Sequence, residues 1–255
     1  MNINAKTALI SGASRGIGAA IAIAFANAGV KKIVLNYYPT DDYEPDAEAN
    51  VLQLQKQLTE LGADSLVVKA DISDSGDVKE LVDKTHSYLD QIDIVVNNAG
   101  IVFDLPIEER TEDQWDRTIN TNLKGTYLLS KELYNHLKAN PSSRLINIAS
   151  TSGLDVLTPD SLDYDASKQG IITLTKNFAQ ELTPSTTVNA IAPGWVDTEM
   201  NKDLPKDFID KEIAKICLGR FARPDEIASI AAFLASDGAS YISGSVIIAD
   251  GGRRH

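Results

Sequence analysis

A tyrosine and a lysine lie four residues apart in the run Tyr-Asp-Ala-Ser-Lys at positions 164–168. On a helix this spacing places both side chains on one face, one turn apart. A tyrosine hydroxyl has an ordinary pKa of about 10, and an ammonium one turn away favours the phenolate and lowers that pKa. Lys168 would then tune Tyr164 as a general acid/base, although an ordinary helical pair explains the same spacing.

Two further polar residues are candidates for the same chemistry. Ser150 follows the apolar run 145–149, so its hydroxyl should lie at the carboxyl end of a strand and donate to a substrate carbonyl oxygen. Asn122 lies inside a long predicted helix, where asparagine is unfavourable because its side chain competes for backbone hydrogen bonds. The alternatives are a loop or cap serine at 150 and a local bend of the helix at 122.

A glycine-rich turn at 11–18, Ser-Gly-Ala-Ser-Arg-Gly-Ile-Gly, follows an apolar run and precedes a helical pattern. This order aims backbone N–H groups and the positive end of a helix dipole at a bound phosphate. The glycines at 12, 16 and 18 depart in spacing from the standard dinucleotide pattern, so a simple strand-to-helix turn is the alternative reading.

Strand-like and helix-like segments alternate along the whole chain. The strands are short continuous apolar runs, which is typical of strands buried on both faces of a parallel sheet. The sequence therefore predicts a single α/β domain over 1–255, a doubly wound parallel sheet of about seven strands with helices on both faces. Strands are predicted at 7–11, 32–37, 65–70, 92–97, 144–149, 187–191 and 245–249, and helices at 17–28, 47–61, 74–89, 112–139, 164–182 and 224–236.

The residues singled out fall where the predicted strands end. Gly12, Asp71, Asn97, Ser150 and the pair Pro193-Gly194 each follow a different strand. In open α/β sheets ligands bind at the carboxyl ends of the strands, near the point where strand order reverses. We therefore expect these residues to meet at one site.

Composition narrows the class of protein. A net charge of −12 opposes nonspecific binding to nucleic acid or to an anionic membrane. The single cysteine, Cys217, excludes an intrachain disulfide and suits a reducing compartment. No basic segment followed by an apolar run precedes the first strand, and no apolar stretch is long enough to cross a bilayer. We expect a cytoplasmic protein without a metal site, a membrane partner or a nucleic-acid partner.

Taken together, these motifs resemble the short-chain dehydrogenase/reductase family, in order and over nearly the whole chain. The match is closest to the branch that is similar to 3-oxoacyl-carrier-protein reductases, and it implies a Rossmann-type fold. The matching pieces are the turn at 11–18, Asp71-Ile72, Asn97-Asn98-Ala99-Gly100, Asn122, Ser150, Tyr164 with Lys168, Pro193-Gly194 with Thr198, and Asp250-Gly251-Gly252.

The resemblance implies a role for each catalytic residue. Tyr164 would protonate a carbonyl oxygen while a nicotinamide delivers hydride to the carbon, and Ser150 would polarise that carbonyl. Lys168 would hold the nicotinamide ribose, and Asn122 would fix a water that links Lys168 to solvent. The implied dinucleotide-binding residues are Gly12, Ser14, Arg15, Gly16, Ile17, Gly18, Asn36, Asp71, Ile72, Asn98, Ala99, Gly100, Tyr164, Lys168, Pro193, Gly194, Val196 and Thr198.

The sequence favours NADP(H) over NAD(H). NAD-preferring relatives carry an acid at the end of the second strand, where this chain has the neutral Asn36. Arg15 can bind a 2′-phosphate through charge-assisted hydrogen bonds. Asp41 and Asp42 argue the other way, because their distance from the glycine turn suits an acid that binds ribose.

The segment at about 196–220 corresponds to the part of the family fold that covers the substrate. With Leu154, Val156 and Leu157 opposite, it predicts an apolar pocket for a ketone with a carbon chain, including a 3-oxoacyl thioester. The alternatives are an NAD(H)-dependent sugar, polyol or steroid dehydrogenase and a noncatalytic nucleotide-binding regulator. The resemblance also implies a homotetramer or a homodimer. The residues expected on the underside of the segment are Trp195, Met200, Leu204, Phe208 and Ile209.

Overall fold

The predicted strands form one parallel sheet in the computed structural model, which describes residues 3–4, 6–40, 44–156, 158–202 and 204–253. The strand order is β3-β2-β1-β4-β5-β6-β7, and every neighbouring pair is parallel. The prediction of a doubly wound α/β domain is confirmed. The strands are β1 (Thr7–Ile10), β2 (Lys32–Tyr37), β3 (Asp64–Lys69), β4 (Ile94–Asn97), β5 (Ser143–Ile148), β6 (Thr186–Pro193) and β7 (Val246–Ala249).

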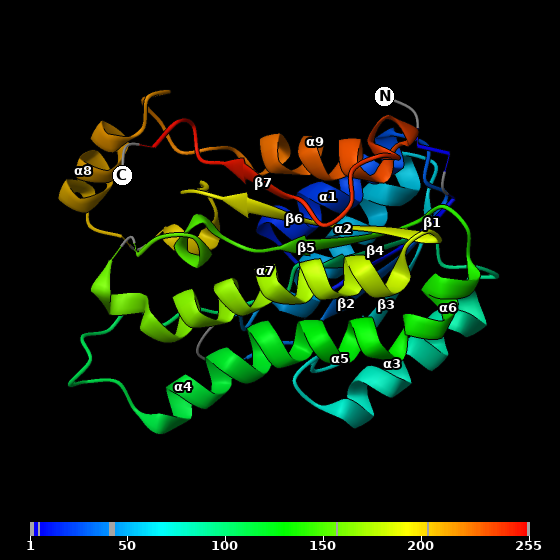
Figure 1. The fold of residues 1–255 in the computed structure, drawn as a ribbon, viewed down its shortest axis with the longest axis horizontal. Coiled ribbons are helices and arrows are strands. Elements are labelled where there is room, and N and C mark those ends of the chain that lie inside the picture. Colours follow the sequence, from blue (N-terminus) through cyan, green and yellow to red (C-terminus); the bar gives the residue numbers. More distant parts are fainter. Residues whose placement is uncertain (1–2, 5, 41–43, 157, 203, 254–255) are drawn as a thin grey trace.

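Helices cover both faces of the sheet (Figure 1). The first face carries α1 (Gly16–Asn27), α2 (Ala47–Glu60) and α9 (Pro224–Ala235). The opposite face carries α3 (Ser75–Tyr88), α4 (Glu112–Thr118), α5 (Gly125–Glu132), α6 (Tyr134–Ala139) and α7 (Leu162–Leu182).

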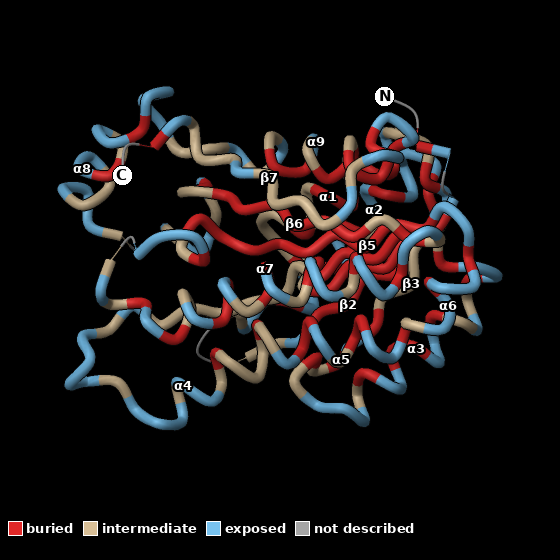
Figure 2. Tube along the Cα trace, in the orientation of Figure 1, coloured by how far each residue is buried: buried red, intermediate tan, exposed pale blue. Residues whose placement is uncertain are grey.

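Successive residues of each central strand enter different cores. In β1, Ala8 and Ile10 pack in the core under α1, whereas Leu9 packs in the core under α3 and α5. All three are fully buried because the sheet is covered on both sides, as the tube in Figure 2 shows. A continuous apolar run, with no polar alternation, is therefore what this sheet requires.

The long helix predicted at 112–139 is interrupted. A π-helical turn (Ile119–Lys124) lies between α4 and α5, and the N–H of Gly125 donates to the carbonyl of Asn120, five residues back. The amide of Asn122 lies inside this turn, where it binds the backbone of Ile101. The helix is thus locally distorted where the sequence placed an unfavourable asparagine, and the cause is a tertiary contact.

The chain reverses strand order between β1 and β4, and the carboxyl ends of the strands share one edge of the sheet. The segment at about 196–220 begins beyond the end of β6 and contains a 3₁₀ turn (Glu199–Asn201) and α8 (Lys206–Lys215). Figure 1 shows α8 beyond the ends of β6 and β7. Within the described part of the chain, no helix is both long enough and apolar enough to cross a membrane.

Candidate active site

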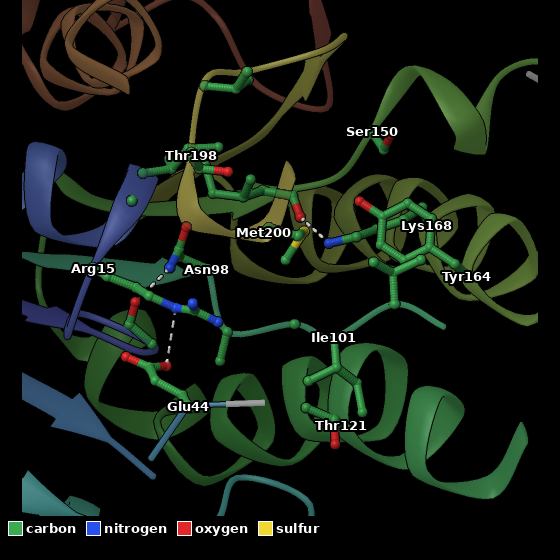
Figure 3. Close-up of a pocket in the computed structure, with 18 of the residues that line it drawn as sticks. Arg15, Glu44, Asn98, Ile101, Thr121, Ser150, Tyr164, Lys168, Thr198 and Met200 are labelled. Carbon is green, nitrogen blue, oxygen red and sulfur yellow. Dashed lines mark hydrogen bonds and ion pairs between the residues drawn. The ribbon is translucent and has the colours of Figure 1, made fainter. Parts of the chain in front are cut away.

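A cavity of about 440 Å³ lies along the carboxyl edge of the strands. Every residue predicted for catalysis or dinucleotide binding lines it, except Gly18 and Asn122. Figure 3 shows that the glycine turn with Arg15 lies at one end and Ser150 with Tyr164 at the other. Gly12 and Thr198 are 186 positions apart in the sequence, and the structure brings both to this cavity.

The glycine turn packs tightly against the protein backbone at positions where a side chain would clash. Gly12 has a φ of +60°, and a Cβ there would lie 2.7 Å from the Cα of Ala99. A Cβ on Gly18 would lie 2.2 Å from the carbonyl oxygen of Gly12, so Gly18 closes the turn from outside the cavity. The Asn98 amide donates to that same oxygen at 2.8 Å and to the carbonyl of Ser11 at 3.1 Å. The turn is therefore held open by contacts with the end of β4.

The amino end of α1 opens onto this turn. Its N-cap, Arg15, makes no side-chain cap hydrogen bond, so the first N–H groups of the helix are available to an anion. Gly16 has a φ of +53°, and Thr198 lies next to it. The Cγ2 atom of Thr198 is 3.4 Å from a Cβ built on the glycine. Helix dipole, backbone N–H groups and a hydroxyl residue therefore surround one space.

Asn36, in β2, and Asp71, which follows β3, make hydrogen bonds near the ends of these strands. The Asn36 amide is buried, donates to the carbonyl of Ala70 at 2.9 Å and accepts from the N–H of Gly12 at 3.4 Å. The Asp71 carboxylate accepts from the N–H of Ser73 at 2.8 Å. Asn36 thus lines the cavity with a side chain whose hydrogen bonds are largely made within the protein.

Tyr164 and Ser150 lie together at the other end of the cavity (Figure 3), close enough for Ser150 to act on the pKa of the phenol. Tyr164 and Lys168 lie one turn apart on α7, and Ser150 follows β5. The Lys168 ammonium donates to the carbonyl of Ile148 at 2.9 Å and lies 5.4 Å from the centre of the Tyr164 ring. The shared face predicted for the pair is therefore present.

The prediction that Lys168 lowers the pKa of Tyr164 is wrong for this arrangement. Burial raises the pKa of Tyr164 to about 12, against a lowering contribution from the hydrogen bond with Ser150. Asp104 and Asp165 raise the pKa further by charge repulsion. Burial also lowers the pKa of the Lys168 ammonium to about 8. Loss of water is the largest cause of both shifts, so the phenol is protonated at neutral pH.

Asn122 and Lys168 face the same small space beside Gly100. A Cβ on Gly100 would lie 3.2 Å from Oδ1 of Asn122 and 3.4 Å from Nζ of Lys168. The Asn122 amide also donates to the hydroxyl of Ser167 at 3.1 Å. Glycine at 100 therefore leaves room between the amide and the ammonium, although Asn122 itself is buried behind the cavity wall.

A buried ion pair fixes the start of α7. Asp163, the residue before Tyr164, lies 2.5 Å from the Arg110 guanidinium, and both side chains are almost fully buried. Arg110 also donates to the carbonyls of Phe103, Leu105 and Asp160. The guanidinium thus ties the loop after β4 to the turn that presents Tyr164.

The substrate end of the cavity is more polar than the sequence predicts. Trp195 and Met200 line it, but Leu154 and Val156 are exposed and do not line it. Leu157 lies outside the described residues. The expected apolar wall is therefore not formed by Leu154 and Val156. The residues that line the cavity at this point are Ser152, Thr158 and Ser161, with Asp104 at the exposed rim.

A buried carboxylate on α8 links the segment 196–220 to the cavity residue Trp195. Glu212 accepts from Trp195 at 2.9 Å, from Arg253 at 2.6 Å and from Lys215 at 2.5 Å. The Phe208 ring meets the Trp195 ring edge-on at a centroid distance of 5.6 Å. Phe208 thus supports a cavity residue from behind, and Leu204 and Ile209 are not among the residues that line the cavity.

Sequence reasoning missed several residues at the dinucleotide end. Thr40 and Glu44 line the cavity together with Tyr38 and Glu199. The acidic run at 41–46 was the available signal, but it is equally typical of a solvated loop. Asp41 and Asp42, the predicted ribose-binding acids, lie outside the described residues.

The chain is similar to known proteins over almost its whole length. A family model described as Enoyl-(Acyl carrier protein) reductase matches residues 12–254. The chain is 34% identical over 253 residues to a 3-oxoacyl-[acyl-carrier-protein] reductase FabG of Thermotoga maritima, covering 99% of each. It is 38% identical over 250 residues to an acetoacetyl-CoA reductase of Shinella zoogloeoides, covering 97% of this chain and 98% of that protein.

A solved structure from Brucella melitensis has the same fold throughout. It is described as a short-chain dehydrogenase/reductase, glucose/ribitol dehydrogenase. The TM-score is 0.89 at 30% identity, and the match covers 100% of both chains.

Proposed function

Since the chain belongs to the short-chain dehydrogenase/reductase family of NAD(P)-dependent oxidoreductases, we propose that it transfers hydride between NADP(H) and a carbonyl or secondary alcohol. A 3-oxoacyl thioester or a related ketone is the proposed substrate. The observation that carries the proposal is that Ser150, Tyr164 and Lys168 line one cavity together with the glycine turn.

When bound, the dinucleotide supplies the hydride and leaves proton transfer and orientation to the protein. The glycine turn and the amino end of α1 fit its diphosphate. The proposed residues on the nicotinamide side are Pro193, Gly194, Val196 and Thr198, which line the cavity between the two ends. Segment 196–220 is proposed to cover the substrate, with Glu212 holding it.

Tyr164 is proposed to give its hydroxyl proton to the carbonyl oxygen during reduction. A pKa of about 12 keeps the phenol protonated at pH 7, as a general acid must be. Ser150 donates a hydrogen bond to the same oxygen as negative charge develops on it. The Lys168 ammonium is largely charged at neutral pH and lies beside the phenol, where it stabilises the phenolate that proton transfer leaves. Asn122 is proposed to hold a water that returns the proton through Lys168.

Replacing Tyr164 by Phe tests this assignment. The variant is expected to lose about 10² to 10⁴-fold in kcat, which is the typical contribution of a positioned acid. Its dinucleotide affinity should match that of the wild type, because the glycine turn is untouched. A variant that keeps turnover would refute the role of Tyr164, and a protein that turns over no carbonyl compound but binds the dinucleotide would instead be a regulator.

The substrate proposal rests on the two relatives that are named for 3-oxoacyl and acetoacetyl thioesters. Oxidation of NADPH, measured at a wavelength where only the reduced form absorbs, should be fastest with acetoacetyl thioesters in a panel of ketones, diketones and sugars. Equal rates for thioesters and simple diketones would contradict a thioester substrate.

A sugar or polyol is the second candidate, and the polar substrate end favours it. Ser152, Thr158, Ser161 and the carboxylate of Asp104 offer hydrogen-bond partners that an alkyl chain leaves unused. The Brucella melitensis structure is described as a glucose/ribitol dehydrogenase. The same panel decides between the candidates: faster turnover of polyhydroxy substrates selects this one.

The preference for NADP(H) rests on Arg15 and on the absence of an acid at position 36. Arg15 lines the cavity beside the glycine turn, and Asn36 uses its amide to brace the sheet. Arg15→Ala should lower kcat/KM for NADPH by about tenfold and leave that for NADH nearly unchanged. Unchanged NADPH kinetics would remove Arg15 from the proposal.

A homotetramer, or a homodimer, in the cytoplasm completes the proposal. Apolar side chains near the last strand support assembly, since Ile248 is 56% exposed on β7 and Tyr241 just before it is fully exposed. The single cysteine suits a reducing compartment. Light scattering after size-exclusion chromatography tests the assembly, and a monomeric mass would contradict it.

A further inference from the structure

Asp165 follows Tyr164 on α7 and does not line the cavity, yet it contacts side chains that do. Its Oδ1 accepts a hydrogen bond from the hydroxyl of Ser161 at 3.0 Å. Ser152 lies close enough to lower the pKa of the same carboxyl group. Ser152, Thr158 and Ser161 line the substrate end of the cavity and form what we call the substrate wall. Asp165 therefore contacts this wall from behind.

The contact with Asp165 determines what the wall can offer a substrate. A serine hydroxyl has one hydrogen to donate, and an ionised carboxylate can only accept. Because Ser161 gives its hydrogen to Asp165, its oxygen has only lone pairs left. Oγ1 of Thr158 lies 3.4 Å from that oxygen, so Thr158 is the donor in this contact. The hydrogen bonds run from Thr158 through Ser161 to Asp165, and both hydroxyl oxygens present lone pairs to the cavity.

Protonation of Asp165 reverses this direction. A protonated carboxyl group carries a hydrogen that it can donate to Ser161, which releases the serine hydrogen for Thr158 or for a ligand. Burial is the largest cause that raises the pKa of Asp165, to about 6. Tyr164 keeps its proton in this range, since its own pKa is about 12. The change from acceptor to donor therefore falls between about pH 5 and pH 7.

Neighbouring charges also favour a proton on Asp165. Asp163, on the same helix, and Asp104, in the loop after β4, both raise its pKa. The Arg110 guanidinium pairs with Asp163 and lowers the pKa of Asp104, whereas Asp160 raises that of Asp104. Asp165 thus takes up a proton in an acidic environment whose nearest guanidinium is bound to another carboxylate.

We propose that Asp165 is a positioning residue that sets the direction of the hydrogen bonds along the substrate wall, and that its ionised form selects ketones with a hydroxyl or N–H group close to the carbonyl. A carbonyl or ether oxygen at the same point would meet lone pairs instead of a donor. This inference rests on the proposed function in placing a ketone against the wall, and it favours polyhydroxy substrates over alkyl chains.

Hydroxyacetone and acetone, which differ by one hydroxyl group, test the proposal. The measured quantity is the ratio of their kcat/KM values with NADPH, in which the effects of pH on the dinucleotide and on Tyr164 cancel. In the wild type this ratio should fall about fivefold between pH 8 and pH 5, because the wall loses an acceptor for the additional hydroxyl group. A ratio that does not change with pH would overturn the proposal.

Asp165→Asn has nearly the same size and does not titrate, so its ratio should be equal at both pH values. Ser161→Ala should also give a constant ratio, because it removes the hydroxyl that changes direction. Glu181→Gln is the matched control, since it removes a carboxylate from an exposed position of the same helix and should keep the wild-type profile. A ratio that still falls in Asp165→Asn or in Ser161→Ala would contradict the assignment.

Carbon NMR of the aspartate carboxyl groups gives a readout that needs no turnover. The signal absent from Asp165→Asn is that of Asp165, and Ser161→Ala should raise its pKa because the serine lowers it in the wild type. An unchanged pKa would overturn the proposed direction. Circular dichroism verifies that each variant is folded. If the protein reduces neither ketone while the pKa rises as expected, the proposed function fails and the direction of the hydrogen bonds stands.

Discussion

Replacing Lys168 by Met should make the ligand-free protein more stable relative to the wild type at neutral pH than at high pH. The ammonium is buried, and burial lowers its pKa from 10.5 to about 8. That difference corresponds to about 3 kcal/mol of unfavourable free energy while the lysine is charged in the folded state. Methionine has a similar length and brings no charge to bury.

The cost of burying the Lys168 charge decreases as the pH rises. Below about pH 8 the lysine is charged in both the folded and the unfolded protein, so the full cost is present. Between about 8 and 10.5 the folded protein releases the proton first, and the cost fades as the pH rises. At pH 9.5 about 1 kcal/mol of the cost is left, so the advantage of the variant should shrink by about 2 kcal/mol between pH 7 and pH 9.5.

The hydrogen bond from Lys168 to the Ile148 carbonyl also affects the difference in unfolding free energy between the variant and the wild type. Its loss costs the variant about 1 to 3 kcal/mol, which offsets much of the gain at pH 7. A neutral amine still donates to that carbonyl, so this loss depends little on pH. The change with pH is therefore the quantity that tests the reasoning.

Urea unfolding at fixed protein concentration, at pH 7 and pH 9.5, measures both proteins. Lys176→Met is the control, because Lys176 lies on the same helix and is exposed. Its stability should run parallel to that of the wild type over this range. If the stability difference between Lys168→Met and the wild type is the same at both pH values, burial of the charge does not destabilise the protein by the amount calculated above.

Three other substitutions probe the parts that hold the site. Gly18→Ala should weaken dinucleotide binding about tenfold or more in a fluorescence titration, because its Cβ would lie 2.2 Å from the carbonyl oxygen of Gly12; unchanged affinity would show that the turn can shift. Asp163→Asn should destabilise the fold by about 3 kcal/mol, or lower Tm by about 6 to 12 °C in calorimetry, because it leaves Arg110 buried without its carboxylate; a smaller drop would mean that the carbonyls suffice. Glu212→Gln should raise the substrate KM about tenfold with dinucleotide affinity unchanged, and an equal change in both would argue for a general loss of structure.

Local pattern was enough to predict the architecture. Continuous apolar runs such as the one at Leu9-Ile10 are typical of strands covered on both faces, and the structure buries these two residues in different cores. Once strands alternate with helices, parallel pairing brings the ends of all strands to one edge. The meeting of Gly12, Ser150 and Tyr164 at one cavity follows from that topology.

Other properties depended on contacts that no local pattern records. Glu44 belongs to an acidic run, and only its contact with Arg15 distinguishes it from a solvated residue. The wall of the substrate end was also not predictable, because the direction of Val156 and Ser161 depends on how one loop folds.

The sequence by itself determined the sheet, the glycine turn after the first strand and the shared face of Tyr164 and Lys168, since each follows from the spacing of neighbouring residues. Only the tertiary structure decided the protonation of that pair. The pKa of each group depends on how much water the surrounding segments exclude, and β5, α7 and the loop after β4 contribute to this from distant parts of the chain. Spacing placed the phenol beside the amine, and burial determined that the phenol keeps its proton.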